Sequence, residues 1–444
     1  LDIRTQLKWS NYADLRDETL VESYINLLAL LVYYKTLALG GDPAQTTITW
    51  FYPVSMDEYE LGVLFRTWKK AYTEVFGLEA TGSRINGIPE SIAPYLYYKS
   101  AVIGQSLSVD IGGGSTDIAL FDENSTRAKM ISSFKFAGNA IFGDGFPTGE
   151  YRNNSDRNGF VRTFAARARE AVTGDTLMQP ILDNILQNTK DSADFSSLLF
   201  ALEAGNRSTF SYTRLLESHK RMKLPILIFY AALAYYSAQL LRRSGEKPPR
   251  YILFSGTASK TAAILDTSSS LTQLSALFTF IFGKVFGEEI PAINLQLSPI
   301  PKEITCKGAL KVGIGDNITG NTIRFWIGGG EDGIWSSAFD KEKQIAETPR
   351  YGEISDEVKA MIESSVKDFY ALLDAFTRSV NLEGAFNIEL HAYELFRRMR
   401  EENISEYLVR GLRAFFKIEE KHIGETLFFY PLIGILNKLS YELA

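Results

Sequence analysis

The sequence predicts an α/β fold followed by a helical extension, and three observations support this class. The segment 107–121, LSVDIGGGSTDIALF, consists of two apolar runs joined by glycines, which predicts a β-hairpin. An apolar, β-branched run at 46–51 precedes a helical pattern at 58–76, so strands and helices alternate. From 353 to 444, apolar residues recur every three or four positions, which predicts helices.

The hairpin carries the most informative chemistry in the sequence. Asp110 ends its first strand, and three glycines and two hydroxyl residues follow: Gly112, Gly113, Gly114, Ser115 and Thr116. Glycines let backbone N–H groups approach an anion closely, and a neighbouring carboxylate can hold Mg²⁺. A P-loop is excluded because no GxxxxGK[ST] run exists, and a dinucleotide fingerprint is excluded because the glycines lead into a strand. The remaining alternative is an ordinary glycine-rich turn.

The run 110–121, DIGGGSTDIALF, strongly resembles the second phosphate motif of the actin-like ATPase superfamily. Members include heat-shock chaperone ATPase domains, actin, bacterial division and shape filaments, sugar kinases and exopolyphosphatases. The run looks most similar to the chaperone and division-filament branch, because exopolyphosphatase-like members usually carry Glu where this chain has Asp117. The resemblance implies two lobes built of ribonuclease H-like mixed sheets flanked by helices, with the hairpin at the cleft between them.

Two segments on either side of the hairpin match this resemblance in order. Segment 86–100 is similar to the element that carries a water-orienting acid, which points to Glu90. Segment 135–142 resembles the small-residue turn and helix that follow the second phosphate hairpin, and it contains Gly138.

Two later segments extend the resemblance. Segment 250–265 resembles the adenosine motif, in which Ser255, Gly256 and Thr257 would contact the nucleotide. Segment 301–311 looks like the last helix of the superfamily, which returns to the first lobe. The resemblance therefore spans roughly Thr46 to Lys311.

The first phosphate hairpin of the superfamily has no counterpart before Glu90. We expect it to lie upstream in a longer protein, and its loss in this branch is the alternative. The predicted division is an incomplete first lobe at 1–105, a second lobe at 106–311 and an extension at 312–444. A helical variable subdomain is expected at about 160–220 of the second lobe.

The extension departs from the superfamily. It is expected to begin with a β-hairpin whose polar turn lies near Gly320 and Asn321, followed by a glycine-rich loop at 328–333. Nothing in it resembles the β-rich peptide-binding domain of heat-shock chaperones, which argues against peptide chaperoning. Its helices suit docking of a protein partner, self-assembly or an added packing layer.

The resemblance implies a site for ATP or ADP with Mg²⁺. Glycine amides would hold the β- and γ-phosphates with Ser115 and Thr116 assisting, Asp110 would contact the metal, and Glu90 would orient the attacking water. Asp117 is expected to cap the turn. The function expected first is an ATPase that acts as a nucleotide-dependent conformational switch or assembly subunit. A non-hydrolysing scaffold and a small-molecule kinase or phosphatase are the alternatives.

Composition narrows the class of protein. The chain has 444 residues and a net charge of −6, and no block of Lys and Arg indicates a nucleic-acid surface. A single cysteine, Cys306, excludes an internal disulfide and suits a cytoplasmic protein. His219, His391 and His422 lack metal-ligand spacing. The apolar run 224–241 is interpreted as a core helix, not a membrane span, because Tyr, Ser and Gln interrupt it.

Overall fold

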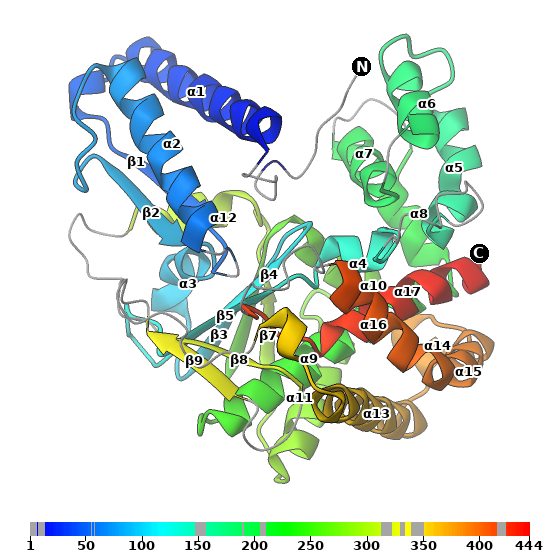
Figure 1. The fold of residues 1–444 in the computed structure, drawn as a ribbon. Helices are drawn as coiled ribbons and strands as arrows, with labels where there is room; N and C mark the ends of the chain where they lie inside the picture. Colours follow the sequence, from blue (N-terminus) through cyan, green and yellow to red (C-terminus); the bar gives the residue numbers. More distant parts are fainter. Residues whose placement is uncertain are drawn as a thin grey trace.

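The computed structural model describes residue 7 and residues 14–54, 56, 58–146, 157–188, 191–204, 210–311, 322–328, 334–338, 350–414 and 423–444. These residues form a small parallel sheet, a larger mixed sheet, and helices around both (Figure 1). The fold is therefore α/β with two lobes and a helical C-terminal extension, as predicted.

The first lobe is built on two parallel strands, β1 (Ile48–Tyr52) and β2 (Ile85–Pro89). They alternate with helices α1 (Leu15–Ala38), α2 (Glu58–Phe76) and α3 (Ile92–Tyr98). The helix predicted at 58–76 is confirmed. Its apolar face packs toward the strands, where Trp68 stacks on Trp50 with ring centroids 6.3 Å apart.

The second lobe is built on a mixed sheet whose strand order, among the described residues, is β7-β6-β3-β4-β5-β8-β9. Its strands are β3 (Ser106–Ile111), β4 (Thr116–Phe121), β5 (Met130–Phe134), β6 (Tyr251–Ser255), β7 (Asn294–Leu297), β8 (Thr322–Trp326) and β9 (Ile334–Ala338). β3 pairs antiparallel with β4 and parallel with β6. The predicted glycine hairpin is therefore confirmed, and it occupies the centre of this sheet.

The turn and the first strand of the hairpin predicted near Gly320 and Asn321 lie outside the described residues. β8 is one of its strands, but the antiparallel partner of β8 in the described residues is β9, which follows it. Segment 312–321 lies outside the described residues, as does most of the glycine-rich loop that joins β8 to β9. β8 also pairs in parallel with β5, so the C-terminal region extends the central sheet.

The two faces of the central sheet contribute to two different cores. Leu107 and Val109 of β3 face a core that contains α9 (Leu224–Arg243) and α11 (Thr272–Phe286). On the other face, Phe121 of β4 stacks on Tyr95 of α3 with ring centroids 3.8 Å apart. By length and composition, α9 is the one helix in the described part of the chain that could cross a membrane. Its most apolar stretch is 94% buried, which confirms the core-helix interpretation.

A close helix crossing joins the two lobes. α12 (Glu303–Ala309) packs on α3, and a Cβ added at Gly308 would lie 1.7 Å from the carbonyl oxygen of Ala93. Only glycine permits this distance. The last helix of the resemblance therefore does return to the first lobe.

A group of helices follows the glycine hairpin, from α4 near the centre of the molecule to α5–α8 toward the upper right of Figure 1. The members are α4 (Gly138–Phe142), α5 (Gly159–Ala171), α6 (Met178–Asn188), α7 (Ala193–Ala204) and α8 (Tyr212–Ser218). The Asn158 side chain caps α5 and donates to the carbonyl oxygens of Ile141 and Gly143 at 3.0 and 2.7 Å, which ties α5 to α4.

The C-terminal helices are α13 (Asp356–Ser379), α14 (Leu382–Phe386), α15 (Leu390–Met399), α16 (Ile404–Ala414) and α17 (Phe429–Leu443). α17 is the most deeply packed of them and contacts α4, α5 and α9. Phe429 stacks on Phe136 with ring centroids 4.2 Å apart. A Cβ added at Gly159 would lie 1.8 Å from the carbonyl oxygen of Ser440. The extension therefore adds a packing layer to the second lobe.

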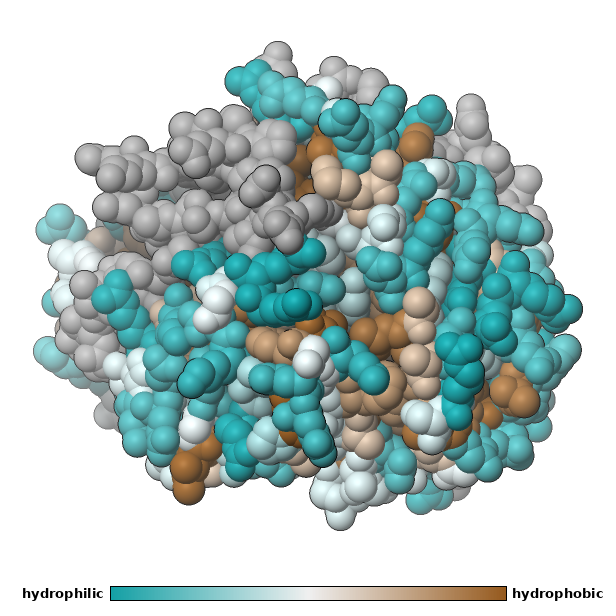
Figure 2. Space-filling view, turned by 90° about the horizontal axis from the view of Figure 1, so that it is seen from below, coloured by the Kyte–Doolittle hydropathy of each residue, from teal (hydrophilic) through white to brown (hydrophobic). Residues whose placement is uncertain are grey.

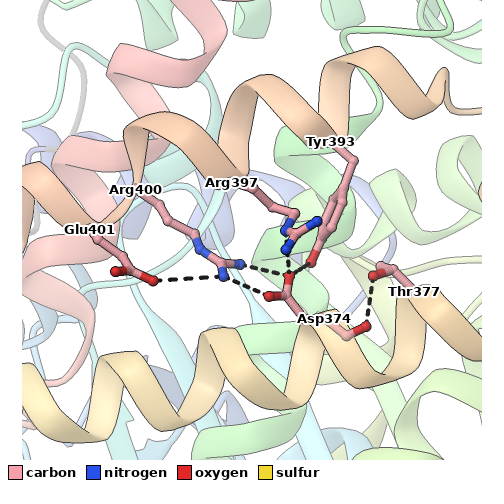
Figure 3. A network of polar contacts seen from close by, with 6 residues as sticks. All are labelled: Asp374, Thr377, Tyr393, Arg397, Arg400 and Glu401. Atoms are coloured by element: carbon pink, nitrogen blue, oxygen red, sulfur yellow. Dashed lines mark hydrogen bonds and ion pairs between the residues drawn. The ribbon is translucent and has the colours of Figure 1, made fainter.

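A polar network fastens α15 to α13 (Figure 3). The Arg400 guanidinium donates two hydrogen bonds to the Asp374 carboxylate, at 2.9 and 2.7 Å. The Tyr393 hydroxyl donates to the same carboxylate at 2.7 Å, and Arg397 lies 3.6 Å from it. Arg400 also lies over the Tyr370 ring, 4.8 Å from its centroid.

Candidate functional site

The tip of the β3–β4 hairpin presents two backbone donors. Gly113 is exposed, and the N–H of Gly112 closes the turn by donating to the Ser115 carbonyl oxygen at 2.9 Å. The N–H groups of Gly113 and Gly114 donate to no partner among the described residues. Such donors, bared by the lack of side chains, suit an anion.

The start of α4 determines where these donors point. The N–H of Gly138 donates to the Gly112 carbonyl oxygen at 3.1 Å, and the N–H of Asn139 donates to the Gly113 carbonyl oxygen at 2.7 Å. In a trans peptide the C=O of one residue and the N–H of the next point in opposite directions. Because both carbonyls face α4, the N–H groups of Gly113 and Gly114 point away from it.

Asp110 connects the hairpin to two later segments. It lies opposite Ser255 in the parallel β3–β6 pair. Its Oδ2 accepts hydrogen bonds from the hydroxyls of Ser255, at 3.1 Å, and Thr305 of α12, at 3.2 Å. The side chain is buried, with 8% of the residue exposed. The two hydroxyls hold the carboxylate in one orientation.

The turn after β6 touches the hairpin directly. Gly256 has φ +80°, and a Cβ there would lie 2.4 Å from Asp110 Oδ1 and 2.3 Å from the Ile111 carbonyl oxygen. The N–H of Gly256 donates to the carbonyl oxygen of Pro301 at 3.1 Å. Thr257 follows, exposed, at the start of a short 3₁₀ turn (Thr257–Lys260). The segments predicted as phosphate hairpin and adenosine motif are therefore in contact.

The donor set fits a Mg²⁺ ion that is held mainly by a ligand. Mg²⁺ commonly binds through one or two carboxylates together with phosphates and water. No group of three or more metal-ligating side chains occurs in the described part of the chain. Asp110, oriented by Ser255 and Thr305, is the carboxylate that would take this role.

Two of the predicted phosphate ligands lie differently from the expectation. Thr116 is fully buried, and its hydroxyl donates to the Phe136 carbonyl oxygen at 2.6 Å. It therefore fixes the segment before α4 and does not offer its hydroxyl at the tip. The Ser115 hydroxyl lies 3.3 Å from Asp117 Oδ2, which gives buried Asp117 a partner within the hairpin.

Glu90 belongs to the first lobe. It follows β2, its side chain is half-buried, and its N–H donates to the Tyr52 carbonyl oxygen at 3.0 Å. The next helix, α3, contacts β3 and β6 of the central sheet. The structure thus gathers the hairpin, Gly138 and the 255–257 turn into one cluster. Glu90 lies between β2 and α3 of the first lobe.

Two contributors had no sequence signal of their own. Thr305 reaches Asp110 across 195 positions of sequence. Asn139 contributes a backbone N–H, which any residue at that position could supply. Only the segments that contain them were singled out.

No protein-family model matches the chain, and no curated protein matches it. Solved structures that it resembles include the ethanolamine utilization protein EutJ from Carboxydothermus hydrogenoformans, at 13% identity and a TM-score of 0.35, covering 66% of this chain and 75% of that one. Another is a PilM–PilN type IV pilus biogenesis complex, at 13% identity and a TM-score of 0.29, covering 57% and 59%. A third is MreB5 of Spiroplasma citri bound to ADP, at 14% identity and a TM-score of 0.28, covering 65% and 74%. All three are proteins of the actin-like ATPase fold.

Proposed function

We propose that this chain binds a purine nucleotide with Mg²⁺ at the glycine hairpin and acts as a nucleotide-dependent conformational switch or assembly subunit. The observation that carries the proposal is the pair of outward N–H groups, at Gly113 and Gly114, beside the oriented carboxylate of Asp110. Amide donors complement phosphate oxygens, and a carboxylate complements the metal that accompanies them. When bound, Mg²⁺ would neutralise phosphate charge.

The adjoining turn supports a nucleoside as the rest of the ligand. Gly256 has no side chain, and Thr257 beside it is exposed, so a flat ring system can approach this backbone. The position of α12 supports a switch. It contacts Asp110 through Thr305 and α3 through Gly308, and therefore links the site to the first lobe. The role of Glu90 in orienting water stays a prediction.

A scaffold without nucleotide turnover is the second candidate, because one observation favours it. Asp110 is buried and holds β6 and α12 in place, which is a structural task in itself. If this is its only task, the hairpin serves to join three segments. The kinase or phosphatase alternative has no comparable support.

Calorimetry with ATP·Mg²⁺ and ADP·Mg²⁺ tests the proposal on the full chain and on Asp110→Asn. We expect binding weaker than about 10 μM, since one phosphate hairpin supplies only part of the usual contacts. Asp110→Asn should weaken Mg²⁺-dependent binding at least about tenfold. The amide oxygen can still accept from Ser255 and Thr305, so the fold should persist, as thermal unfolding will verify.

The matched control is Asp122→Asn, which removes an acid from the exposed turn after β4. It should leave binding unchanged. Equal binding by wild type and Asp110→Asn would place the nucleotide elsewhere. Complete lack of binding by a folded wild-type chain would favour the scaffold.

A further inference from the structure

Exposed apolar residues are concentrated on one helix. In the described part of the chain, fifteen large apolar residues are exposed, and nine of them belong to α1 or immediately follow it. These nine are Leu15, Tyr24, Leu27, Leu30, Leu31, Val32, Tyr34, Leu37 and Leu39. α1 lies at the edge of the first lobe, beside α2 (Figure 1). The side of the molecule seen from below is mostly hydrophilic, with apolar residues gathered chiefly near the centre of the view (Figure 2).

The exposed surface is not the face by which α1 joins the lobe. Val21, Ile25 and Ala29 are buried against the first-lobe core, where α1 packs on α2. On the same side, Glu22 forms an ion pair with Lys70 of α2. α1 is therefore apolar on two faces, and its own lobe covers only one of them.

The spacing on the outer face indicates that its partner is another helix. Leu20, Tyr24, Leu27, Leu31, Tyr34 and Ala38 are separated by alternating steps of four and three residues. A 3.5-residue period is the repeat of coiled coils, in which the side chains of two helices interdigitate along the length of the contact. Between positions 23 and 34 the helix carries no charge, so nothing in the middle of this seam repels an apolar partner.

The seam is nearly symmetrical about its centre, which points to a second copy of this chain. In an antiparallel pair whose centre lies midway between Leu27 and Leu31, Leu27 faces Leu31 of the other copy and Tyr24 faces Tyr34. Lys35 then lies opposite Ser23, so no like charges meet. A two-fold interface requires this kind of self-complementarity.

The exposed apolar area of α1 is large for a monomer. Taking roughly 200 Å² as the full area of a large side chain, the nine exposed residues correspond to about 1,000 Å², of which Tyr24, Leu27, Leu31 and Tyr34 on the seam supply about 480 Å². The largest apolar patch of a typical monomer is about 300–600 Å². Each partner of a standard interface buries about 800 Å², so residues that flank the seam must contribute to the contact as well.

We propose that α1 is a self-association surface, through which two copies of this chain pack antiparallel, α1 against α1, with Leu27 and Leu31 at the centre. The proposal does not depend on nucleotide, since none of these residues belongs to the glycine-hairpin cluster.

Sedimentation equilibrium of the full chain is the first test, from about 1 to 100 μM without nucleotide. The wild type should be a dimer, and Leu27→Glu/Leu31→Glu should weaken dimerisation by more than about 100-fold, because the substitutions place four carboxylates in the dimer interface. The control, Leu177→Glu/Leu390→Glu, alters two leucines that are comparably exposed, at 56% and 62%, and should leave the dimer intact. Circular dichroism confirms that each variant is folded.

Disulfide trapping tests the orientation. Cys306→Ser removes the native thiol, and Tyr24→Cys and Tyr34→Cys are then made separately in that background. Mixing the two under mild oxidation should yield the 24–34 cross-linked dimer faster than either variant cross-links to itself. A monomeric wild type, a dimer that survives the charge substitutions, or preferential 24–24 cross-linking would each overturn the proposal. So would a monomer that binds neutral phospholipid vesicles through α1.

Discussion

Gly256 is the residue of the candidate site that should tolerate substitution least. Its positive φ disfavours every other residue, and a side chain there would meet the Asp110 carboxylate and the Ile111 backbone. Gly245 provides a contrast, because its φ is +72° but no atom lies within 4 Å of the Cβ position. Substitutions at the two glycines therefore distinguish the energetic cost of backbone strain from that of steric overlap.

We predict that Gly256→Ala lowers the free energy of unfolding by about 4 kcal/mol, of which ~1 kcal/mol is conformational strain and ~3 kcal/mol is overlap. Gly245→Ala should cost only the strain, about 1 kcal/mol. Urea unfolding of both variants measures the difference. Equal losses would show that the β6 turn moves freely away from the hairpin.

At the scale of single residues, part of the candidate site could be predicted from the sequence. The strand period of two already places Thr116 on the same side as Ile118 and Leu120, which face the core, so its buried hydroxyl was foreseeable. Its assignment as a phosphate ligand followed the motif and ignored the alternation. The Asp110–Thr305 contact was not foreseeable, because a single sequence carries no record of pairing across so many residues.

Among the elements, α13 and α15 are joined by charge as well as by apolar packing. Burial raises the pKa of the Asp374 carboxyl, but the Arg400 fork, the Tyr393 hydroxyl and Arg397 together outweigh it and hold the pKa below its usual range. The charged pair therefore stabilises the fold above about pH 4, the value for an unfolded Asp. This contribution is lost as pH falls through the lowered folded pKa.

We predict that Asp374→Asn destabilises the protein by about 3–5 kcal/mol at pH 7, because the buried Arg400 guanidinium then has only the exposed Glu401 carboxylate, 4.0 Å away, as a counter-charge. The double variant Asp374→Leu/Arg400→Met removes both charges and should cost far less. Between pH 5 and 3 the wild type should lose more stability than the double variant. Identical acid sensitivity of the two proteins would contradict the assigned role.

The elements themselves were predicted with uneven success for a physical reason. α2 and the β3–β4 hairpin carry long, clear periodicities, and both were placed correctly. β9 is five residues long, IWSSA, and follows a glycine-rich segment. Its apolar pattern was therefore too short to favour a strand over a loop. The pairing of β8 with β9 was therefore not predicted.

At the scale of the whole molecule, the C-terminal layer and the central sheet share one core. Phe429 of α17 contacts both Phe134 of β5 and Phe136, with ring centroids 4.7 and 4.2 Å away, and α17 also contacts α9. α1, in contrast, has one face packed on α2 and the other exposed. Regions that share buried contacts tend to open together.

We predict that native-state hydrogen exchange gives the same opening free energy for slow amides of β3–β5 and of α17. Monomeric protein, such as the Leu27→Glu/Leu31→Glu variant, should show a lower value for α1. Measurement at several low urea concentrations separates local from global opening. Earlier opening of α17 than of the sheet would mean that the C-terminal layer is a separate cooperative unit.

The crossing of α3 and α12 has a mechanical consequence. Thr305 and Gly308 are one helical turn apart on α12, the first bonded to Asp110 and the second pressed against the Ala93 backbone. Contacts between long side chains have slack, because rotamers can absorb a small displacement. A contact between backbone atoms cannot adjust in this way. α12 is therefore a rigid connection between Asp110 and α3. If the Asp110 carboxylate shifts far enough to displace Thr305, either α3 must move with it or the Thr305 hydrogen bond must break.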